Sequence, residues 1–387
     1  MKDFKKFTDF VRETYQVPTE FIPLHPPYFN GNEKKYLNEC IDSTFVSSVG
    51  KFVNQFEEMV AKFTGAKYAI AASNGTAALH MALILAEVQP KDEVLSQALT
   101  FVATANAISY ANATPVFIDV DKDTMGMSPT ALSDFLKNNT VLDTHPVTGK
   151  KQPKNNTTGN FITTCVPMHT FGHPLRIDQI KSICDEYNIT LLEDAAESLG
   201  SYYKGKHTGT FGEIGTLSFN GNKTITTGGG GMLITNNEAL AKKAKHLTTT
   251  AKVPHKWHYI HDHIGYNYRL TNLAAALGVA QMEQLKYILE RKKVLAKQYQ
   301  EFFSSEKMEF VSQKANSEVN YWLNAVICEN KTEQQEFLEF TNNQGVMTRP
   351  IWELMNRLEM FKNAPKGDLS NSEWLADRVV NIPSGVM

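Results

Sequence analysis

The sequence has few cysteines, almost no net charge and no long apolar run. Its four cysteines, among 387 residues, form no CxxC pair and no Cys/His cluster, so we expect no zinc site. Lys and Arg total 39 against 41 Asp and Glu, and this balance gives no compositional support for nucleic-acid binding. Because no apolar stretch reaches about 18 residues, we expect no contact with a membrane interior.

The first residues, MKDFKKFTDFVRETY, are not typical of a signal peptide. They lack a continuous apolar segment and a cleavage site of small residues. Phe4, Phe7, Phe10 and Val11 recur at helical spacing, which predicts a short helix packed on the body of the protein. We therefore expect a cytoplasmic protein.

Short β-rich runs alternate with helical patterns from about residue 55 to residue 245. This alternation predicts an α/β domain with a large, mostly parallel sheet, which binds ligands at the carboxyl ends of its strands. The strand candidates are Tyr68–Ala72, Glu93–Ser96, Pro115–Val120, Phe161–Pro167, Thr190–Glu193, Gly215–Phe219 and Gly231–Thr235, the last two forming a hairpin-like pair. The helix candidates include Asn54–Thr64 and Ala77–Ala86.

The sequence as a whole predicts three parts of the chain. Residues 1–30 form an N-terminal segment, and residues 31–250 form the large domain. Residues 251–387 contain a linker loop, a long helix over Asn272–Gln300 and a smaller C-terminal α+β domain. In that domain we expect a strand at Tyr321–Cys328 and a helix at Thr332–Asn342. Residues 138–160 are polar and rich in turn formers, which predicts an exposed loop.

Ser73–Leu79 (SNGTAAL) is the first of three segments that carry chemistry. A strand ends, Gly75 permits a tight turn and a helix begins. The free N–H groups of a helix start suit a phosphate, although ordinary helix capping gives the same pattern.

The second segment is Glu193–Ser198 (EDAAES), which follows an apolar strand. Asp194 would be partly desolvated there and would need a cation partner, such as a protonated pyridine nitrogen. A helix-capping aspartate is the alternative interpretation.

The third segment, Ser218–Thr227 (SFNGNKTITT), leads into Gly228–Gly231. Lys223 lies in a polar, glycine-bounded turn between two strands, and a lysine can both form an imine and move a proton. The segment is not a P-loop, because Asn222 separates Gly221 from Lys223 and no helix pattern follows.

Together these segments resemble the DegT–DnrJ–StrS sugar aminotransferases, which are fold type I enzymes that use pyridoxal 5′-phosphate (PLP). The resemblance runs from about Phe45 to Ser384. It implies that Lys223 forms the Schiff base with PLP and that Asp194 pairs with the pyridinium nitrogen. The further cofactor-binding residues that it implies are Gly75, Thr76 and Ser218 at the phosphate, Phe101 and Ala196 on the two ring faces, Thr104 close to Phe101, Glu197 beside O3′, and Asn267 from the partner subunit of a homodimer with composite sites.

The resemblance also implies the reaction. Glutamate would donate an amino group to C4 of a nucleotide-linked 4-keto-6-deoxy sugar, giving an amino sugar for surface glycans. Two segments, Phe45–Gly50 and Met347–Trp352, most resemble those of family members that act on 2-acetamido sugars in legionaminic acid or bacillosamine-type pathways. Both UDP and GDP carriers fit, and a perosamine-type GDP sugar is the alternative. The expected substrate contacts are His169, Ser47, Arg349 and Trp352.

Other interpretations are a PLP-fold sugar dehydratase and a non-catalytic binding protein of the same fold. Dehydratases of this group replace the lysine with histidine, so Lys223 argues against the first. The retained set of cofactor residues argues against the second. Trp257, His258, His261 and His263 form a cluster in which we expect no metal, because no pattern of supporting carboxylates accompanies it.

Overall fold

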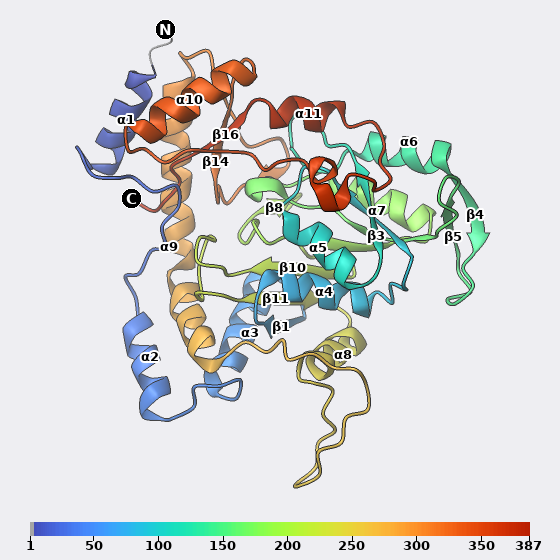
Figure 1. Cartoon of the computed structure of the whole chain (residues 1–387). Helices are drawn as coiled ribbons and strands as arrows, with labels where there is room; N and C mark the ends of the chain where they lie inside the picture. Colours follow the sequence, from blue (N-terminus) through green and yellow to red (C-terminus); the bar gives the residue numbers. More distant parts are fainter. Residues whose placement is uncertain (1–3) are drawn as a thin grey trace.

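The computed structural model describes residues 4–387, so the first three residues of the expected N-terminal segment lie outside the described residues. Helix α1 (Lys5–Tyr15) confirms the predicted short helix. Its buried Phe7 and Val11 join an apolar cluster with Tyr299 and Phe337, so this helix packs against elements from the far end of the chain. Figure 1 shows α1 beside the upper end of α9.

The centre of the fold is a seven-stranded sheet with the order β1-β11-β10-β7-β6-β2-β3. Only β11 runs antiparallel to its neighbours β1 and β10, and the other pairs are parallel. The predicted α/β architecture with a mostly parallel sheet is therefore confirmed. The strands are β1 (Tyr68–Ala72), β2 (Glu93–Gln97), β3 (Thr114–Ile118), β6 (Ile162–Val166), β7 (Thr190–Asp194), β10 (Ile214–Ser218) and β11 (Gly231–Thr235).

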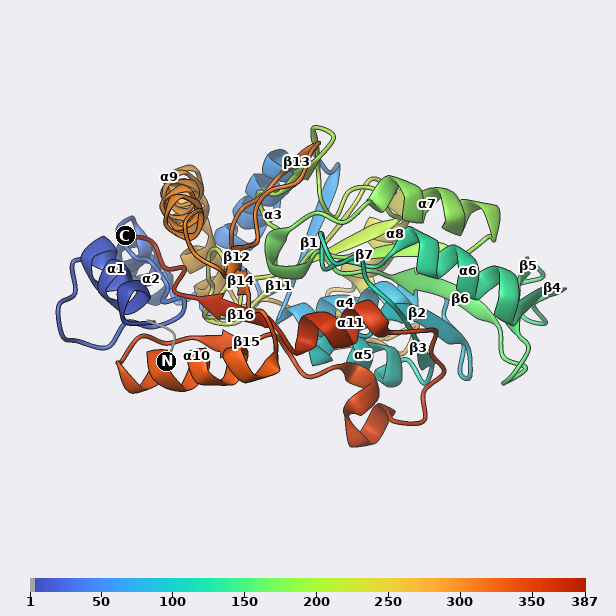
Figure 2. The ribbon, with the colours of Figure 1, turned by 90° about the horizontal axis from the view of Figure 1, so that it is seen from above.

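Helices cover both faces of this sheet, as Figure 2 shows. Successive side chains of a strand point to opposite faces, so Ile70 and Ala71 of β1 enter different apolar clusters. One cluster includes α3 and the start of α9, and the other includes α4, α5 and α8. These helices are α3 (Lys51–Thr64), α4 (Gly75–Leu85), α5 (Val102–Tyr110), α8 (Glu238–Thr248) and α9 (Asn272–Phe303). Three further helices are α2 (Glu33–Asp42), α6 (Pro129–Asn139) and α7 (Ile177–Glu186).

The long helix α9 links the large sheet to a smaller antiparallel sheet of order β12-β14-β16-β15. Ala275 and Ala276 near its start pack on the large sheet, whereas Leu295 and Tyr299 pack in the cluster of the small sheet. The elements of this part are β12 (Glu309–Phe310), β14 (Asn324–Ile327), α10 (Lys331–Asn343), β15 (Arg349–Pro350), α11 (Ser370–Ala376) and β16 (Val379–Ile382). Short pieces are η1 (Thr170–Gly172), η2 (Met355–Arg357) and η3 (Glu359–Phe361) and the sheet of β8 (Tyr202–Tyr203), β9 (Lys206–His207) and β13 (Ser317–Glu318).

The prediction of a loop over residues 138–160 is wrong. Strands β4 (Thr140–Thr144) and β5 (Lys151–Asn155) form an antiparallel hairpin that projects from the body. In the connection between the two strands, the His145 ring lies 3.1 Å from the buried carboxylate of Asp92. Because β4 is mostly exposed on both faces, its sequence lacks the apolar alternation that predicts a strand.

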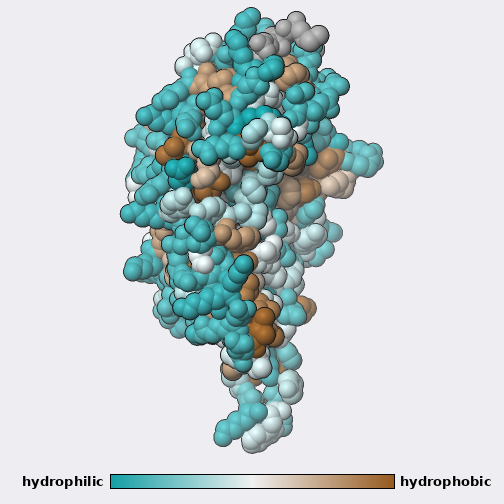
Figure 3. Space-filling model, turned by 90° about the vertical axis from the view of Figure 1, so that its left-hand side faces the viewer, coloured by the Kyte–Doolittle hydropathy of each residue, from teal (hydrophilic) through white to brown (hydrophobic). Residues whose placement is uncertain are grey.

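A second projection, residues 249–271 between α8 and α9, extends downward in Figure 1. It exposes the large apolar side chains of Trp257, Tyr259, Ile260 and Ile264. The side of the molecule in Figure 3 is mainly hydrophilic, with separate hydrophobic patches above the projecting tip. Among residues 4–387, no helix combines the length and apolar character needed to cross a membrane.

Candidate active site

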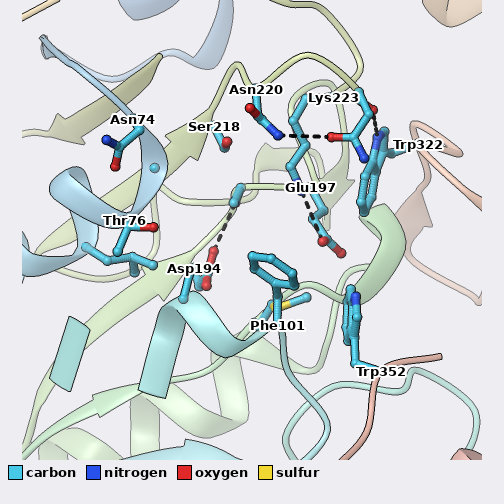
Figure 4. Close-up of a pocket in the computed structure, with 16 residues that line it drawn as sticks. Asn74, Thr76, Phe101, Asp194, Glu197, Ser218, Asn220, Lys223, Trp322 and Trp352 are labelled. Carbon is cyan, nitrogen blue, oxygen red and sulfur yellow. Dashed lines mark hydrogen bonds and ion pairs between the residues drawn. The ribbon is translucent and has the colours of Figure 1, made fainter. Parts of the chain in front are cut away.

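A cavity of about 330 Å³ opens at the carboxyl ends of the sheet strands, between the large sheet and the small-sheet side of the chain. Figure 4 shows side chains from both parts pointing into it. Its lining residues are Asn74, Gly75, Thr76, Leu79, Phe101, Ala103, Met168, Asp194, Ala196, Glu197, Ser218, Asn220, Asn222, Lys223, Trp322 and Trp352. The three sequence segments singled out for their chemistry thus meet in one place.

Asp194 is the last residue of β7, and its carboxylate is buried at the cavity wall. Oδ2 accepts a hydrogen bond from the Thr104 hydroxyl at 2.7 Å, and Oδ1 accepts one from the Ala196 N–H at 3.1 Å. Burial raises the pKa of Asp194 in spite of these hydrogen bonds and the nearby charge of Lys223. A desolvated carboxylate of this kind is stabilised by a cationic ligand group.

Lys223 lies in the turn between β10 and β11, as its glycine-rich surroundings predict. Its Nζ lies 3.1 Å from Glu197 Oε1 and 3.7 Å from the centroid of the Trp322 ring. Burial raises the pKa of Glu197 from its ordinary 4.5 to about 7, against the opposing charge of Lys223. The cavity therefore contains an amine with a buried acid as its immediate neighbour.

The start of α4 forms the opposite end of the cavity. The Asn74 side chain caps this helix by accepting the Ala77 N–H at 2.8 Å, while Gly75 and Thr76 face the open space. A Cβ on Gly75 would lie 3.0 Å from Ser218 Cβ and 3.1 Å from its Oγ. This close approach leaves free N–H groups and a hydroxyl around one small volume, which suits an anion.

The glycine run after Lys223 permits a second close approach. A Cβ on Gly231 would lie 2.3 Å from the carbonyl oxygen of Asn74, so a side chain there would collide with the loop before α4. Glycine at this position lets β11 pass directly behind the expected phosphate site.

Two aromatic side chains form one wall. Phe101 precedes α5 and remains 48% exposed, and its ring centroid lies 6.1 Å from that of Trp352. Trp352 comes from the segment after β15, so the small-sheet side completes the cavity.

Several expected contacts lie outside this lining. His169 is fully buried, and its Nε2 lies 3.1 Å from Glu193 Oε2 behind β7. Ser47 is exposed, and its carbonyl accepts the Asn272 N–H. Arg349 is also exposed and donates to Asn342 Oδ1 at 2.9 Å. Asn267 is exposed on the projecting segment, with a backbone bridge to Thr249.

The structure groups His246, Asp262 and His263, of which only His263 belongs to the histidine cluster noted in the sequence. Asp262 Oδ1 lies 2.6 Å from His246 Nε2 and 2.9 Å from His263 Nδ1. Hydrogen bonds from His263, which has the larger effect, and from His246 lower the pKa of Asp262 to about 2. Their ligand atoms are close enough together to hold an ion, and the absence of a metal stays a prediction.

Sequence reasoning missed Trp322, Asn220 and Asn222 as cavity residues. Asn220 and Asn222 were visible beside Lys223, and polarity in a turn is the signal that could have found them. Trp322 reaches the cavity only through the packing of the small-sheet side on the large sheet, and no local pattern predicts this.

Comparison with known proteins adds an independent result. Residues 27–387 match the DegT/DnrJ/EryC1/StrS aminotransferase family. The chain is 38% identical to EpsN of Bacillus subtilis (strain 168), whose name places it among the pyridoxal phosphate-dependent aminotransferases, over 94% of this chain and 91% of that one.

Two further similarities agree. GDP-perosamine synthase of Escherichia coli O157:H7 is 36% identical, with 94% of this chain and 93% of the relative covered. The crystal structure of the aminotransferase TlmJ from Streptoalloteichus hindustanus superposes with a TM-score of 0.84 at 23% identity, covering 94% of this chain and 93% of TlmJ.

Proposed function

The chain belongs to the DegT/DnrJ/EryC1/StrS aminotransferase family, whose cofactor is pyridoxal 5′-phosphate, and we propose that it aminates C4 of a nucleotide-linked 4-keto-6-deoxy sugar. Glutamate is the proposed amino donor. The exchange is balanced, because glutamate becomes 2-oxoglutarate as the ketone oxygen of the sugar is replaced by an amino group. One sequence feature, the presence of Lys223 in place of histidine, favours amino transfer over dehydration.

The residues of the cavity fit PLP at both of its ends. The buried Asp194 carboxylate, whose pKa is raised by burial, would hold a proton on the ring nitrogen. Thr104 and the Ala196 N–H hold that carboxylate in place. Gly75, Thr76 and Ser218 would hold the phosphate, because a glycine is needed where Ser218 approaches the helix start. Phe101 and Ala196 would contact the two ring faces, and Glu197 would lie beside O3′.

Lys223 is the proposed acid and base of the reaction. When bound, PLP supplies a carbonyl that exchanges for an amino group and a ring that delocalises negative charge from the adjacent carbon. The Lys223 amine takes the proton from the α-carbon of glutamate and, in the second half of the reaction, delivers a proton to sugar C4, which gains a C–H bond as it gains the amino group. Glu197, 3.1 Å away, orients this amine.

We also propose a homodimer in which Asn267 serves the phosphate of the partner's site. Asn267 is exposed and does not line the cavity of its own chain. It lies on the projecting segment that also exposes Trp257, Tyr259 and Ile264. Exposed apolar side chains on an extended segment are typical of an interface between subunits.

The sugar nucleotide would enter along the aromatic wall, where Trp352 lines the cavity. Arg349 and Ser47 are exposed near the surface and remain proposed contacts of the nucleotide and the sugar. His169 would act only through Glu193, since its ring is fully buried against that carboxylate. A 2-acetamido sugar is our first candidate. A GDP sugar of the perosamine type is the second candidate, and it is supported by the 36% identity to GDP-perosamine synthase.

The observation that carries the proposal is the convergence of Lys223, Asp194 and the α4 start on one cavity. The test is a panel of UDP- and GDP-linked 4-keto-6-deoxy sugars, with and without the 2-acetamido group, incubated with PLP and glutamate. We expect one of them to yield a 4-amino sugar and 2-oxoglutarate in equal amounts. The proposal fails if none of the sugars is aminated by a protein that binds PLP.

A further inference from the structure

Trp322 covers the amine of Lys223 from the small-sheet side. It lies just before β14, is only 4% exposed and lines the cavity. Its indole face lies 3.7 Å from Lys223 Nζ, and Glu197 Oε1 lies 3.1 Å from the same atom. The amine is thus held between an aromatic face and a carboxylate, as Figure 4 shows.

The indole is fixed to the turn that carries Lys223. Its Nε1–H donates to the carbonyl oxygen of Asn222 at 2.6 Å, one residue before the lysine. The position of the ring and the position of the amine are therefore set by the same turn.

The backbone of Trp322 is fixed as well. Its N–H donates to Asn320 Oδ1 at 2.9 Å, and Asn320 in turn donates to the Glu197 carbonyl oxygen at 2.8 Å. The Trp322 carbonyl accepts a hydrogen bond from the fully buried Lys292 of α9 at 3.1 Å. Because these anchors join α9 and the Glu197 turn, Trp322 has little freedom to move away from Lys223.

An ammonium over an indole is attracted by the negative face of the ring, and burial strengthens that attraction. We propose that Trp322 is a positioning residue for Lys223: it holds the free amine beside Glu197. This inference rests on the proposed function, because it concerns the amine that moves protons in it. Simple core packing against Phe171, whose ring centroid lies 6.4 Å away, is the alternative.

The test measures how fast Lys223 is acetylated in the full chain without added cofactor, followed by peptide mass spectrometry. The amine must leave the indole face in order to react, so losing that face should speed labelling. Trp322→Leu removes both the face and the N–H donor. Trp322→Phe keeps a weaker aromatic face and retains most of the packing. Trp352→Leu is the matched control, since it takes an indole from the same cavity but leaves the face over Lys223.

We expect Trp322→Leu to label roughly 2- to 30-fold faster than the wild type, with Trp322→Phe between them and Trp352→Leu close to the wild type. An equal gain in Trp352→Leu would mean easier access to the cavity only and would overturn the proposal.

If Trp322→Leu does not fold, the comparison of Trp322→Phe with the wild type decides alone, and identical labelling rates would contradict the role. No sugar takes part in this experiment. A negative labelling result together with amination of a sugar by the wild type would therefore overturn the inference and leave the proposed function intact.

Discussion

The Nζ of Lys223 lies 3.1 Å from a carboxylate oxygen of Glu197, and both side chains are largely withdrawn from water. Glu197 also accepts the Phe171 N–H on its other oxygen, Oε2, at 2.8 Å. Burial outweighs these stabilising contacts and raises the pKa of Glu197 to about 7. The acid beside the amine therefore titrates close to neutral pH.

This titration predicts a pH-dependent stability. Because the pKa of Glu197 is higher in the folded chain than its ordinary 4.5, the folded state binds the proton more tightly. The contribution of Glu197 is complete below about pH 4.5 and is lost as the pH rises through about 7. Melting temperatures of the wild type without added cofactor, measured relative to Glu197→Gln, should fall across this window and then level off. Glu301→Gln, an exposed carboxylate on α9, is the control, and parallel curves for the wild type and Glu197→Gln would contradict the prediction.

Asp194→Asn should weaken PLP binding. The substitution keeps the size of the side chain but removes the charge that would hold a proton on the ring nitrogen. Loss of a charge-assisted hydrogen bond costs about 1.5–3 kcal/mol, or roughly 10- to 100-fold in affinity. Thr104→Val removes a hydrogen bond to Asp194 and one with Thr100 but leaves the carboxylate charge, so its effect should be smaller. Titration of each variant with PLP measures this, and wild-type affinity in Asp194→Asn would remove the carboxylate from the cofactor site.

Gly75→Ala should act on the phosphate end alone. The added Cβ would come 3.0 Å from Ser218 Cβ and would spread the start of α4 away from β10. The preference of the protein for PLP over pyridoxal, which lacks the phosphate, should then decrease. Gly229→Ala is a matched control, because its Cβ would lie 3.9 Å from the nearest atom. An unchanged preference in Gly75→Ala would place the phosphate elsewhere.

Asn267 offers a test of the composite site. Asn267→Ala and Lys223→Ala should each have low activity, because one lacks the partner's phosphate contact and the other lacks the amine. In mixed dimers one of the two sites contains both native residues, so mixing should restore up to roughly a quarter of wild-type activity. If subunits exchange without any recovery, the two residues do not serve one site from different chains.

The limits of prediction from the sequence are visible in particular elements. Strands β1 and β11 were predicted with their observed bounds, because each is a short apolar run between turn formers. The cavity residues on β7, β10 and α4 could be predicted, because carboxyl ends of parallel strands lie at one edge of the sheet. The β4–β5 hairpin was missed, since β4 is exposed and the buried residues of β5 are polar or proline, so neither strand shows apolar alternation. Trp322 was missed because its place depends on contacts with Asn222 and Lys292, each about 30 residues or more away in sequence.

The most direct measurement is the visible absorbance of the protein mixed with PLP, followed before and after glutamate is added. For the wild type we expect a visible band that glutamate removes and that a suitable 4-keto sugar nucleotide restores. Lys223→Ala should give no such cycle and no sustained amino transfer, even though it can still take up the cofactor. Appreciable steady-state transfer by Lys223→Ala, or a wild type that stays colourless with PLP, would contradict the account.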